Sequence, residues 1–341
     1  MAEEGRVFLR GMTSEQYGLG ELRRRQRAAD RVVRGGWKLG RDTAGYGDHG
    51  DRSQATWLVA PGDDPFLTQT LQSHFVELFP GGWNKGHGHQ NEALFYILEG
   101  AGYEIHDGKR YDWKKDDVVV VHTDSVHQHF NASETERAVC LVIKAKATWM
   151  YLGLVQQGRG GPAADGLGPR EDWSRLWSPG VEAKRKVITT ADAPWATTAE
   201  GRVRVITSPA RTDLRAHSVD LYQQEIPAGG RSARHWHMAD ELVYVMSGEG
   251  HGLHWDVEAE IEDKYYARIA TAPSRWAVKA GEMLYVPQNT VHQHVNDGAA
   301  PLLLLSAQNR MFKLLGYDSV VYLEDATDGS ASASTARVAV S

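Results

Sequence analysis

Histidines gather in four short clusters of this sequence, and their spacing indicates metal binding. Eight of the fifteen histidines lie in His87-Gly88-His89, His127-Gln128-His129, His235-Trp236-His237 and His292-Gln293-His294. Side chains at positions i and i+2 of a strand point to the same face, so the two histidines of a cluster can approach one ion together. Ordinary core or surface histidines would not be expected in two matching sets. The sequence therefore predicts a metal-binding module that occurs twice in the chain.

The residues around these histidines also repeat in the same order. In the second copy the cluster residues are accompanied by Glu241, Gly248, the run Gly281–Pro287 and Asn296, and in the first by Gly100 and Asn131. This arrangement resembles the two sequence motifs of the cupin superfamily. The ligands that the resemblance implies are His235, His237, Glu241 and His292 in the second copy, and His87, His89 and His127 in the first.

The two copies differ at the position of the carboxylate ligand. Ala93 stands where the second copy has Glu241, and Glu92, one residue earlier, would face the other side of a strand. For an octahedral ion, three protein ligands leave three open positions, enough for a substrate that chelates through two oxygens and for dioxygen. Four protein ligands leave only two. A three-histidine set therefore favours catalysis over a closed structural site.

The first copy resembles a narrower group of bicupins. The run GHQNEALFYILEG, from Gly88 to Gly100, followed by the cluster 127–129, is similar to the gentisate, 1-hydroxy-2-naphthoate and salicylate 1,2-dioxygenases. That resemblance implies Fe(II) held by three histidines in the first domain. It makes His129 an acid/base or substrate hydrogen-bonding group, or a partner that only steadies a metal ligand. His294 is the corresponding catalytic candidate in the second copy.

One departure from this family bears on the substrate, because Phe95 stands where an arginine usually binds the substrate carboxylate. Strand alternation places Phe95 and Ile97 on the metal side as pocket residues, together with Ala93. An aromatic wall offers stacking worth roughly 0.5–1.5 kcal/mol, but no charge-assisted pair for a carboxylate. We therefore expect a hydroxylated aromatic with a less acidic ortho group, or none. Arginines that could still supply a cation are Arg41, Arg52 and Arg110.

The predicted function is a non-haem Fe(II)-dependent dioxygenase that cleaves the ring of a hydroxylated aromatic compound with dioxygen, at the first site. The complete second ligand set keeps open a quercetinase-like or oxalate-decarboxylase-like enzyme acting there. Val243 and Val245 share the inward face with Glu241 and suit an apolar substrate better than oxalate. A third alternative is a non-enzymatic bicupin that binds metal or a small molecule. Mn, Ni, Cu or Zn could replace Fe(II), because histidine ligands bind all of them.

Composition and charge narrow the class of protein. The 341 residues fit about two domains of ~150 residues, in agreement with the offset of 148 residues between His87 and His235. A net charge of −6 gives no support to nucleic-acid binding, and a single cysteine, Cys140, excludes a disulfide within one chain. The N-terminus lacks signal-peptide features, and no apolar run approaches ~20 residues. We expect a cytoplasmic protein that does not contact membranes.

The elements that must position the histidines are short strands separated by turns, which indicates an all-β protein. In the first copy we expect strands at Ser73–Leu78, Ala93–Leu98, Gly102–His106, Asp117–His122, His127–Phe130 and Ala138–Ala145. In the second copy we expect them at Val203–Thr207, Ser218–Glu225, Leu242–Met246, Leu253–Val257, Met283–Val286 and Leu302–Ser306. Asp107-Gly108 predicts a hairpin turn. The longer interval between the histidine clusters of the second copy predicts an added hairpin or loop within Glu258–Arg275.

The predicted organisation is two tandem cupin barrels (double-stranded β-helix, jelly-roll) with an N-terminal helical arm. We expect the arm at 1–55, the first cupin domain at 56–155, a linker at 156–185, the second cupin domain at 186–324 and a disordered tail at 325–341. Within these, helices are expected at Ser14–Val33 and Asp172–Trp177, and the Gly-rich start of the linker is Gln156–Ala164. Residues 41–53 are rich in Gly and Asp. Such arms often pack across a partner subunit, so we expect a homo-oligomer.

Overall fold

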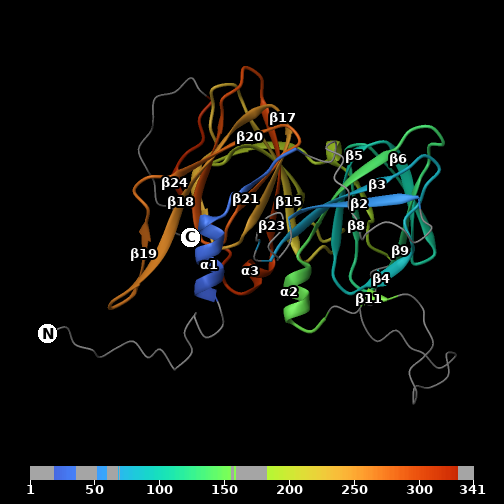
Figure 1. Cartoon of the computed structure of the whole chain (residues 1–341), viewed down its shortest axis with the longest axis horizontal. Coiled ribbons are helices and arrows are strands. Elements are labelled where there is room, and N and C mark those ends of the chain that lie inside the picture. The colour runs from blue at the N-terminus through green and yellow to red at the C-terminus, as the bar shows by residue number, and fades with distance from the viewer. Residues whose placement is uncertain are drawn as a thin grey trace, which may run out of the picture.

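The clustered histidines lie in two β-barrels that stand side by side, the first in blue-green and green and the second in yellow to red in Figure 1. This is a computed structural model, and it describes residues 19–35, 52–59, 68, 70–154, 157–158 and 183–328. The helices among them are short: α1 (Leu19–Ala28), α2 (Lys146–Tyr151) and α3 (Met311–Leu314). None of these described helices is both long and apolar enough to span a membrane. The predicted all-β class with two barrels is confirmed.

The first barrel is formed by a six-stranded sheet, in the order β12-β8-β5-β10-β3-β2, and a five-stranded sheet, in the order β11-β4-β9-β6-β7. Its strands are β2 (Ser53–Val59), β3 (Gln72–Leu78), β4 (His87–His89), β5 (Ala93–Glu99), β6 (Ala101–His106), β7 (Lys109–Lys114), β8 (Asp117–Val121), β9 (Ser125–Asn131), β10 (Ala138–Lys144), β11 (Gln157–Gly158) and β12 (Val187–Thr189). The β6–β7 hairpin turns at Asp107 and Gly108, with φ of 48° and 79°. Both residues have the positive φ that a type I′ turn requires, so this predicted turn is confirmed.

The second barrel repeats the plan, with one much longer strand, β18. One sheet has the order β1-β21-β17-β23-β15-β14-β13, and the other β19-β18-β22-β16-β24, with β20 paired to β18. The strands are β1 (Val32–Val33), β13 (Trp195–Thr198), β14 (Gly201–Thr207), β15 (Val219–Ile226), β16 (Arg234–His237), β17 (Glu241–Ser247), β18 (Glu249–Ile261), β19 (Tyr265–Ile269), β20 (Ser274–Lys279), β21 (Met283–Val286), β22 (Thr290–Asn296), β23 (Leu302–Asn309) and β24 (Val321–Glu324). The predicted insertion is the β18–β19 hairpin.

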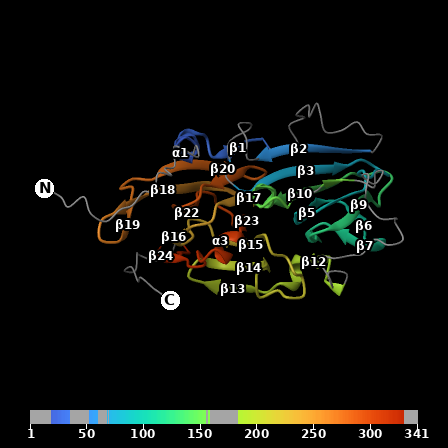
Figure 2. The ribbon, with the colours of Figure 1, turned by 90° about the horizontal axis from the view of Figure 1, so that it is seen from below.

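Each barrel contains one short strand that was predicted to belong to a different segment of the chain. Val187–Thr189 pairs with β8 of the first barrel, although the boundary predicted at residue 186 placed it in the second domain. Val32–Val33, predicted to lie in a helix, pairs instead with β21 of the second barrel. Figure 2 shows β1 above the second barrel and β12 below the first. Strands of two or three residues are fixed by tertiary pairing, so their own sequences carry little signal.

The helix predicted for Ser14–Val33 is shorter within the described residues, where α1 ends at Ala28. Asp30 accepts a hydrogen bond from the Val32 N–H, a local bond that competes with helix continuation. Arg31 is buried and donates to Asp256 at 3.0 Å, and Gln26 donates to the Tyr285 hydroxyl. The described part of the arm therefore packs on the second barrel of its own chain.

The two barrels share one apolar core. Residues of the first barrel such as Phe75 and Tyr96 cluster with Leu221, Tyr244 and Leu305 of the second. Phe75 and Tyr244 meet edge to face, with ring centroids 6.1 Å apart. Burial of this shared surface fixes the barrels relative to each other.

Several predicted segments at the ends of the barrels differ from the structure or lie outside it. The stretch predicted as the Gly-rich start of the linker contains β11, which pairs with β4. The helix predicted at Asp172–Trp177 lies outside the described residues. Of the tail predicted at 325–341, Thr327 forms a bridge with Arg231, and residues beyond 328 lie outside the described part. Ordered structure thus continues past the predicted end of the second domain.

Candidate metal centres

The first candidate centre is formed by three histidines on two paired strands. His87 and His89 lie on β4, and His127 lies opposite His87 on β9. Their ring centroids are 4.5–5.4 Å apart, and the three offer ligand nitrogens that all lie within 4.8 Å of one another. His87 is partly exposed, whereas the other two are buried. The structure therefore brings the predicted ligands of the first copy together on the paired strands β4 and β9.

Hydrogen bonds to the main chain set the orientation of these rings. The Nδ1 of His87 lies 2.9 Å from the Lys85 carbonyl oxygen, and the Nδ1 of His89 lies 2.6 Å from that of Asn91. A carbonyl accepts only from N–H, so Nδ1 carries the proton and Nε2 presents its lone pair. The buried Nε2 of His89 has no hydrogen-bond partner. An acceptor nitrogen left unpaired in this way fits a bound metal ion.

Burial keeps these imidazoles neutral. It lowers the pKa of His87 to about 4 and that of His89 to about 3, with a further contribution from the charge of Lys144. Burial likewise lowers the pKa of His127 well below its ordinary value. Neutral imidazole is the form that binds metal, so these three histidines can bind a metal ion at neutral pH without first losing a proton. The donor set suits a divalent transition metal.

The second centre contains the complete predicted set. His235 and His237 on β16, with His292 on β22, form the second histidine triad. The Glu241 carboxylate lies among them, 3.0 Å from the Nε2 of His237 and 3.4 Å from that of His292. Although burial acts to raise its pKa, hydrogen bonds with these two histidines hold the pKa of Glu241 well below the ordinary value. The site therefore places three imidazole rings and one carboxylate together.

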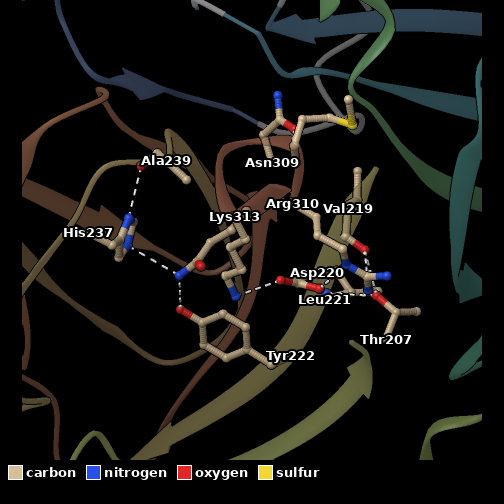
Figure 3. A network of polar contacts seen from close by, with 12 residues as sticks. Thr207, Val219, Asp220, Leu221, Tyr222, His237, Ala239, Asn309, Arg310 and Lys313 are labelled. Carbon is tan, nitrogen blue, oxygen red and sulfur yellow. Dashed lines mark hydrogen bonds and ion pairs between the residues drawn. The ribbon is translucent and has the colours of Figure 1, made fainter. Parts of the chain in front are cut away.

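Neighbouring residues hold the second centre in place. Figure 3 shows His237 bonded to the Ala239 carbonyl oxygen, at 2.9 Å from Nδ1. Tyr222 donates its hydroxyl to Glu241 at 2.7 Å, and the amide nitrogen of Gln308 lies 3.2 Å from the Nε2 of His237. The buried Nε2 of His235 has no partner, so this site too fits a metal ion.

Neither Ala93 nor its neighbour Glu92 supplies a carboxylate ligand to the first centre. Ala93 is buried and offers no donor. The Glu92 side chain points to the junction between the barrels, where its Oε2 accepts hydrogen bonds from the backbone N–H groups of His217 and Ser218 and from the Ser218 hydroxyl. Glu92 therefore joins the two domains and takes no part in the first metal centre.

His129, the first catalytic candidate, has a carboxylate beside it. Glu104 on β6 lies opposite His129 on β9, with 3.6 Å between Glu104 Oε2 and His129 Nδ1. Burial raises the pKa of Glu104 and lowers that of His129 to about 3. The Nε2 of His129 is buried and unpartnered, and its ring lies 4.3 Å from that of Phe95. This carboxylate–imidazole pair was not foreseen, because it depends on the register between two strands.

His294, the corresponding candidate of the second copy, has no carboxylate opposite it on the paired strand, although the charge of Glu241 acts to raise its pKa. Gly252 lies opposite it on β18, at the place that Glu104 holds in the first barrel. Burial lowers the pKa of His294 to about 3. The second barrel therefore lacks a carboxylate on the paired strand that could stabilise a protonated His294.

The predicted pocket residues Phe95 and Ile97 lie in the first barrel's interior, packed with Val119, Val121 and Val142. Phe95 reaches the site through its contact with His129, whereas Ile97 is fully buried in the apolar core. The structure thus gives Phe95 a place at the site and Ile97 a place beneath it. Cys140 belongs to the same apolar cluster, and burial raises the pKa of its thiol to about 12.

Lys144 is a cation at this site that was not predicted from the sequence. Lys144 ends β10 on the same face as Cys140 and Val142, and its charge lowers the pKa of the site histidines His87 and His89. Burial, and then the charge of Lys146, lower the pKa of Lys144 to about 8. It is thus still protonated in most molecules at pH 7. Strand alternation from Val142 would have been enough to find it.

The arginines considered from sequence do not take this place. Arg110 is exposed on the β6–β7 hairpin, where it lies over the Tyr103 ring and pairs with Asp112. Arg52 is exposed at the start of β2, and Arg41 lies outside the described residues.

Comparisons with known proteins agree with this architecture. A family described as "Cupin domain" matches residues 74–144, and one described as "Cupin" matches residues 191–310. No curated protein sequence matches the chain. Among solved structures, a glycine-to-alanine variant of salicylate 1,2-dioxygenase from Pseudoaminobacter salicylatoxidans, in complex with gentisate, matches with a TM-score of 0.64 and 15% identity over 92% of each chain. The same enzyme as gentisate adducts matches with a TM-score of 0.60 and 13% identity, over 82% of this chain and 80% of that one.

Proposed function

Because this chain belongs to the cupin superfamily, as a bicupin that resembles the gentisate and salicylate dioxygenases, we propose that it is a non-haem Fe(II)-dependent dioxygenase. It cleaves the ring of a hydroxylated aromatic compound at the first histidine centre. The observation that carries this assignment is the Glu104–His129 pair beside three histidines with no carboxylate ligand. The second barrel has glycine in place of that glutamate.

The first centre suits a substrate that needs open coordination positions. His87, His89 and His127 would hold the ion through Nε2, and the bond from Nδ1 to the main chain keeps the rings of His87 and His89 in position. Fe(II) held there supplies the redox chemistry through which dioxygen reacts with a bound aromatic ring. Three protein ligands leave room for both partners, and the partly exposed His87 places this site nearer to solvent than the second.

His129 provides the proton chemistry of the site. Its Nε2 is buried and has no hydrogen-bond partner, so it is placed to accept the proton of a substrate hydroxyl when Glu104 stabilises the imidazolium that forms. The imidazolium so formed would direct its Nδ1–H to Glu104, which stabilises the positive charge. Phe95 packs on the same ring and limits its rotation. The proton is thus taken at a defined atom and held away from solvent.

The second centre supports a second candidate function. Its four donors, His235, His237, Glu241 and His292, are all buried and resemble the set expected for a quercetinase-like or oxalate-decarboxylase-like enzyme. Val243 and Val245 lie in an apolar cluster, as the sequence predicted for an inward-facing wall. In our proposal this centre binds metal and stabilises the second barrel.

The test is an oxygen-electrode assay of Fe(II)-reconstituted protein with a panel of hydroxylated aromatics. We expect one O₂ consumed per ring cleaved, with both atoms of ¹⁸O₂ found in the product by mass spectrometry. His129→Ala should reduce turnover while the metal content stays unchanged, and His294→Ala is the matched control in the second barrel. Oxygen consumption that depends on His294 and not on His129 would instead favour the second candidate.

A further inference from the structure

The β18–β19 hairpin projects from the second barrel on the side away from the first barrel (Figures 1 and 2). Side chains two residues apart on a strand share a face, and the register of the hairpin aligns the faces of its two strands. Toward the barrel one face packs with Trp255, whereas toward the tip Ile261 is 40% and Tyr265 79% exposed. This face is apolar along its whole length and consists of Val257, Ala259, Ile261, Tyr265, Ala267 and Ile269.

The opposite face of the hairpin is polar, and its charges are paired within the chain. Glu258 forms an ion pair with Arg27 of α1, and Glu260 forms one with Arg268 of β19 at 3.0 Å. The hairpin is therefore amphipathic, with a polar face that is satisfied and an apolar face that the described residues leave partly uncovered. An exposed apolar surface with a polar surround marks a site of contact with another molecule.

The outer edge of β19 also has free backbone groups. The Ala270 N–H donates to the Asp256 carbonyl oxygen at 2.9 Å, so in this antiparallel pair the even-numbered residues of β19 direct their backbone groups to β18. The odd-numbered residues direct theirs outward, and they are Tyr265, Ala267 and Ile269. Because β19 is the last strand of its sheet, these groups have no hydrogen-bond partner among the described residues. An open edge of this kind is a template for pairing with another strand.

We propose that this edge pairs with the same edge of a second copy of the chain, about a two-fold axis at Ala267. Antiparallel pairing then places Ala267 opposite the partner's Ala267, and Tyr265 opposite the partner's Ile269. The outward N–H and C=O groups of these residues satisfy one another. The apolar faces of the two hairpins join into one face of a four-stranded sheet. Such a contact uses the same patch on both copies and closes on itself.

Charge complementarity favours a second copy as the occupant. The pairing places Arg268 opposite the partner's Tyr266, so a guanidinium meets an aromatic ring and no two like charges lie directly opposite each other. Glu258 and Glu260 belong to β18, so they lie on the two outer strands of the joined sheet. The negative charge of each chain, −6 in total, is therefore not concentrated where the copies meet.

Sedimentation velocity over a range of protein concentrations measures this association in the full chain. The wild type should associate reversibly. Ala267→Pro should raise the dissociation constant about 5- to 150-fold, because proline removes the N–H at the axis and a symmetric dimer loses two hydrogen bonds. The Ala267 N–H points away from β18, so the variant keeps the backbone hydrogen bonds of the hairpin itself.

Ala259→Pro is the matched control. Ala259 lies opposite Ala267 in the hairpin, and its N–H points away from β19, to the other edge. The pairing of β18 with β22 ends at Asp256, so this N–H is not used there either. The control therefore introduces the same residue into the same hairpin and should leave the dissociation constant unchanged.

Disulfide cross-linking tests the position of the axis. In the proposed pairing the Cα of Ala267 lies about 5.5 Å from that of the partner's Ala267, within the range that a disulfide spans. Lys264 at the tip is three residues from the axis, so it lies about 20 Å from its counterpart. Mild oxidation should link Ala267→Cys into a covalent dimer but not Lys264→Cys. The native Cys140 is buried and should not react.

Three results would overturn the proposal. The first is a dissociation constant of Ala267→Pro within about twofold of the wild type, or a wild type that stays monomeric. The second is equal cross-linking of the two cysteine variants. The third is slow amide exchange of Tyr265, Ala267 and Ile269 that does not vary with protein concentration, which would assign the edge to another segment of the same chain. None of these results bears on the proposed function, because the hairpin contains no residue of either metal centre.

Discussion

The Glu104→Gln substitution tests whether the carboxylate beside His129 contributes to proton transfer. Gln keeps the volume of the side chain and one acceptor oxygen but removes its charge. At 3.6 Å and an effective dielectric constant of about 20, a carboxylate and an imidazolium attract by about 4–5 kcal/mol. The amide dipole recovers part of this, so we expect about 2–4 kcal/mol, or roughly a 30- to 1000-fold loss in kcat.

The assay is steady-state oxygen uptake on the best aromatic substrate, with kcat and KM measured separately. The loss should fall on kcat, because Glu104 acts once His129 has taken a proton, whereas the metal content and the KM should change little. Glu99→Gln, at the end of the preceding strand β5 and partly exposed, is the control. A kcat of Glu104→Gln within about twofold of the wild type would refute this role. It would mean that the carboxyl, whose pKa is raised by burial, stays protonated during the reaction.

Two other predictions follow from the centres and their surroundings. Fully loaded protein should contain two transition-metal ions per chain by elemental analysis, and His87→Ala and His235→Ala should each remove one; a wild type with one ion would contradict this. Burial, and then the charge of Lys186, lower the pKa of His122 in the folded protein to about 3. In the unfolded chain this histidine binds a proton near pH 6.5, whereas in the folded protein it stays neutral at that pH. Stability from the neutral ring is therefore complete above pH 6.5 and lost as the pH falls toward 3, about 2 kcal/mol between pH 7 and 5. Urea titrations at pH 7 and pH 5 would measure the free energy of unfolding of the wild type and of His122→Gln. Between these two pH values we expect the free energy of the variant to fall by about 2 kcal/mol less than that of the wild type. Equal decreases in the two proteins would contradict this role of His122.

The histidine centres could be predicted from sequence because their geometry is local. Two histidines separated by one residue on a strand face the same side whatever the rest of the fold does. The contrast between Ala93 and Glu241 was also visible, because it requires only the repeat. The ligand triads therefore come together in the structure as the sequence indicated.

The residues missed around the centres depend on pairing between distant segments. Glu104 meets His129 only through the register of β6 with β9. Lys144 could have been placed inward by alternation, but its position beside Ala93 needs the pairing of β10 with β5. The short strands β1 and β12 were missed for the same reason, since each is fixed by the barrel that it joins.

The central claim is that ring cleavage takes place at the first centre, and paired ligand substitutions test it most directly. Oxygen uptake and metal content would be measured for His127→Ala and Glu241→Ala, each loaded with Fe(II) under the same conditions. We predict that His127→Ala abolishes oxygen uptake, whereas Glu241→Ala retains most of it because the second centre lies in the other barrel. The reverse pattern, activity retained in His127→Ala and lost in Glu241→Ala, would contradict the account and place the reaction in the second barrel.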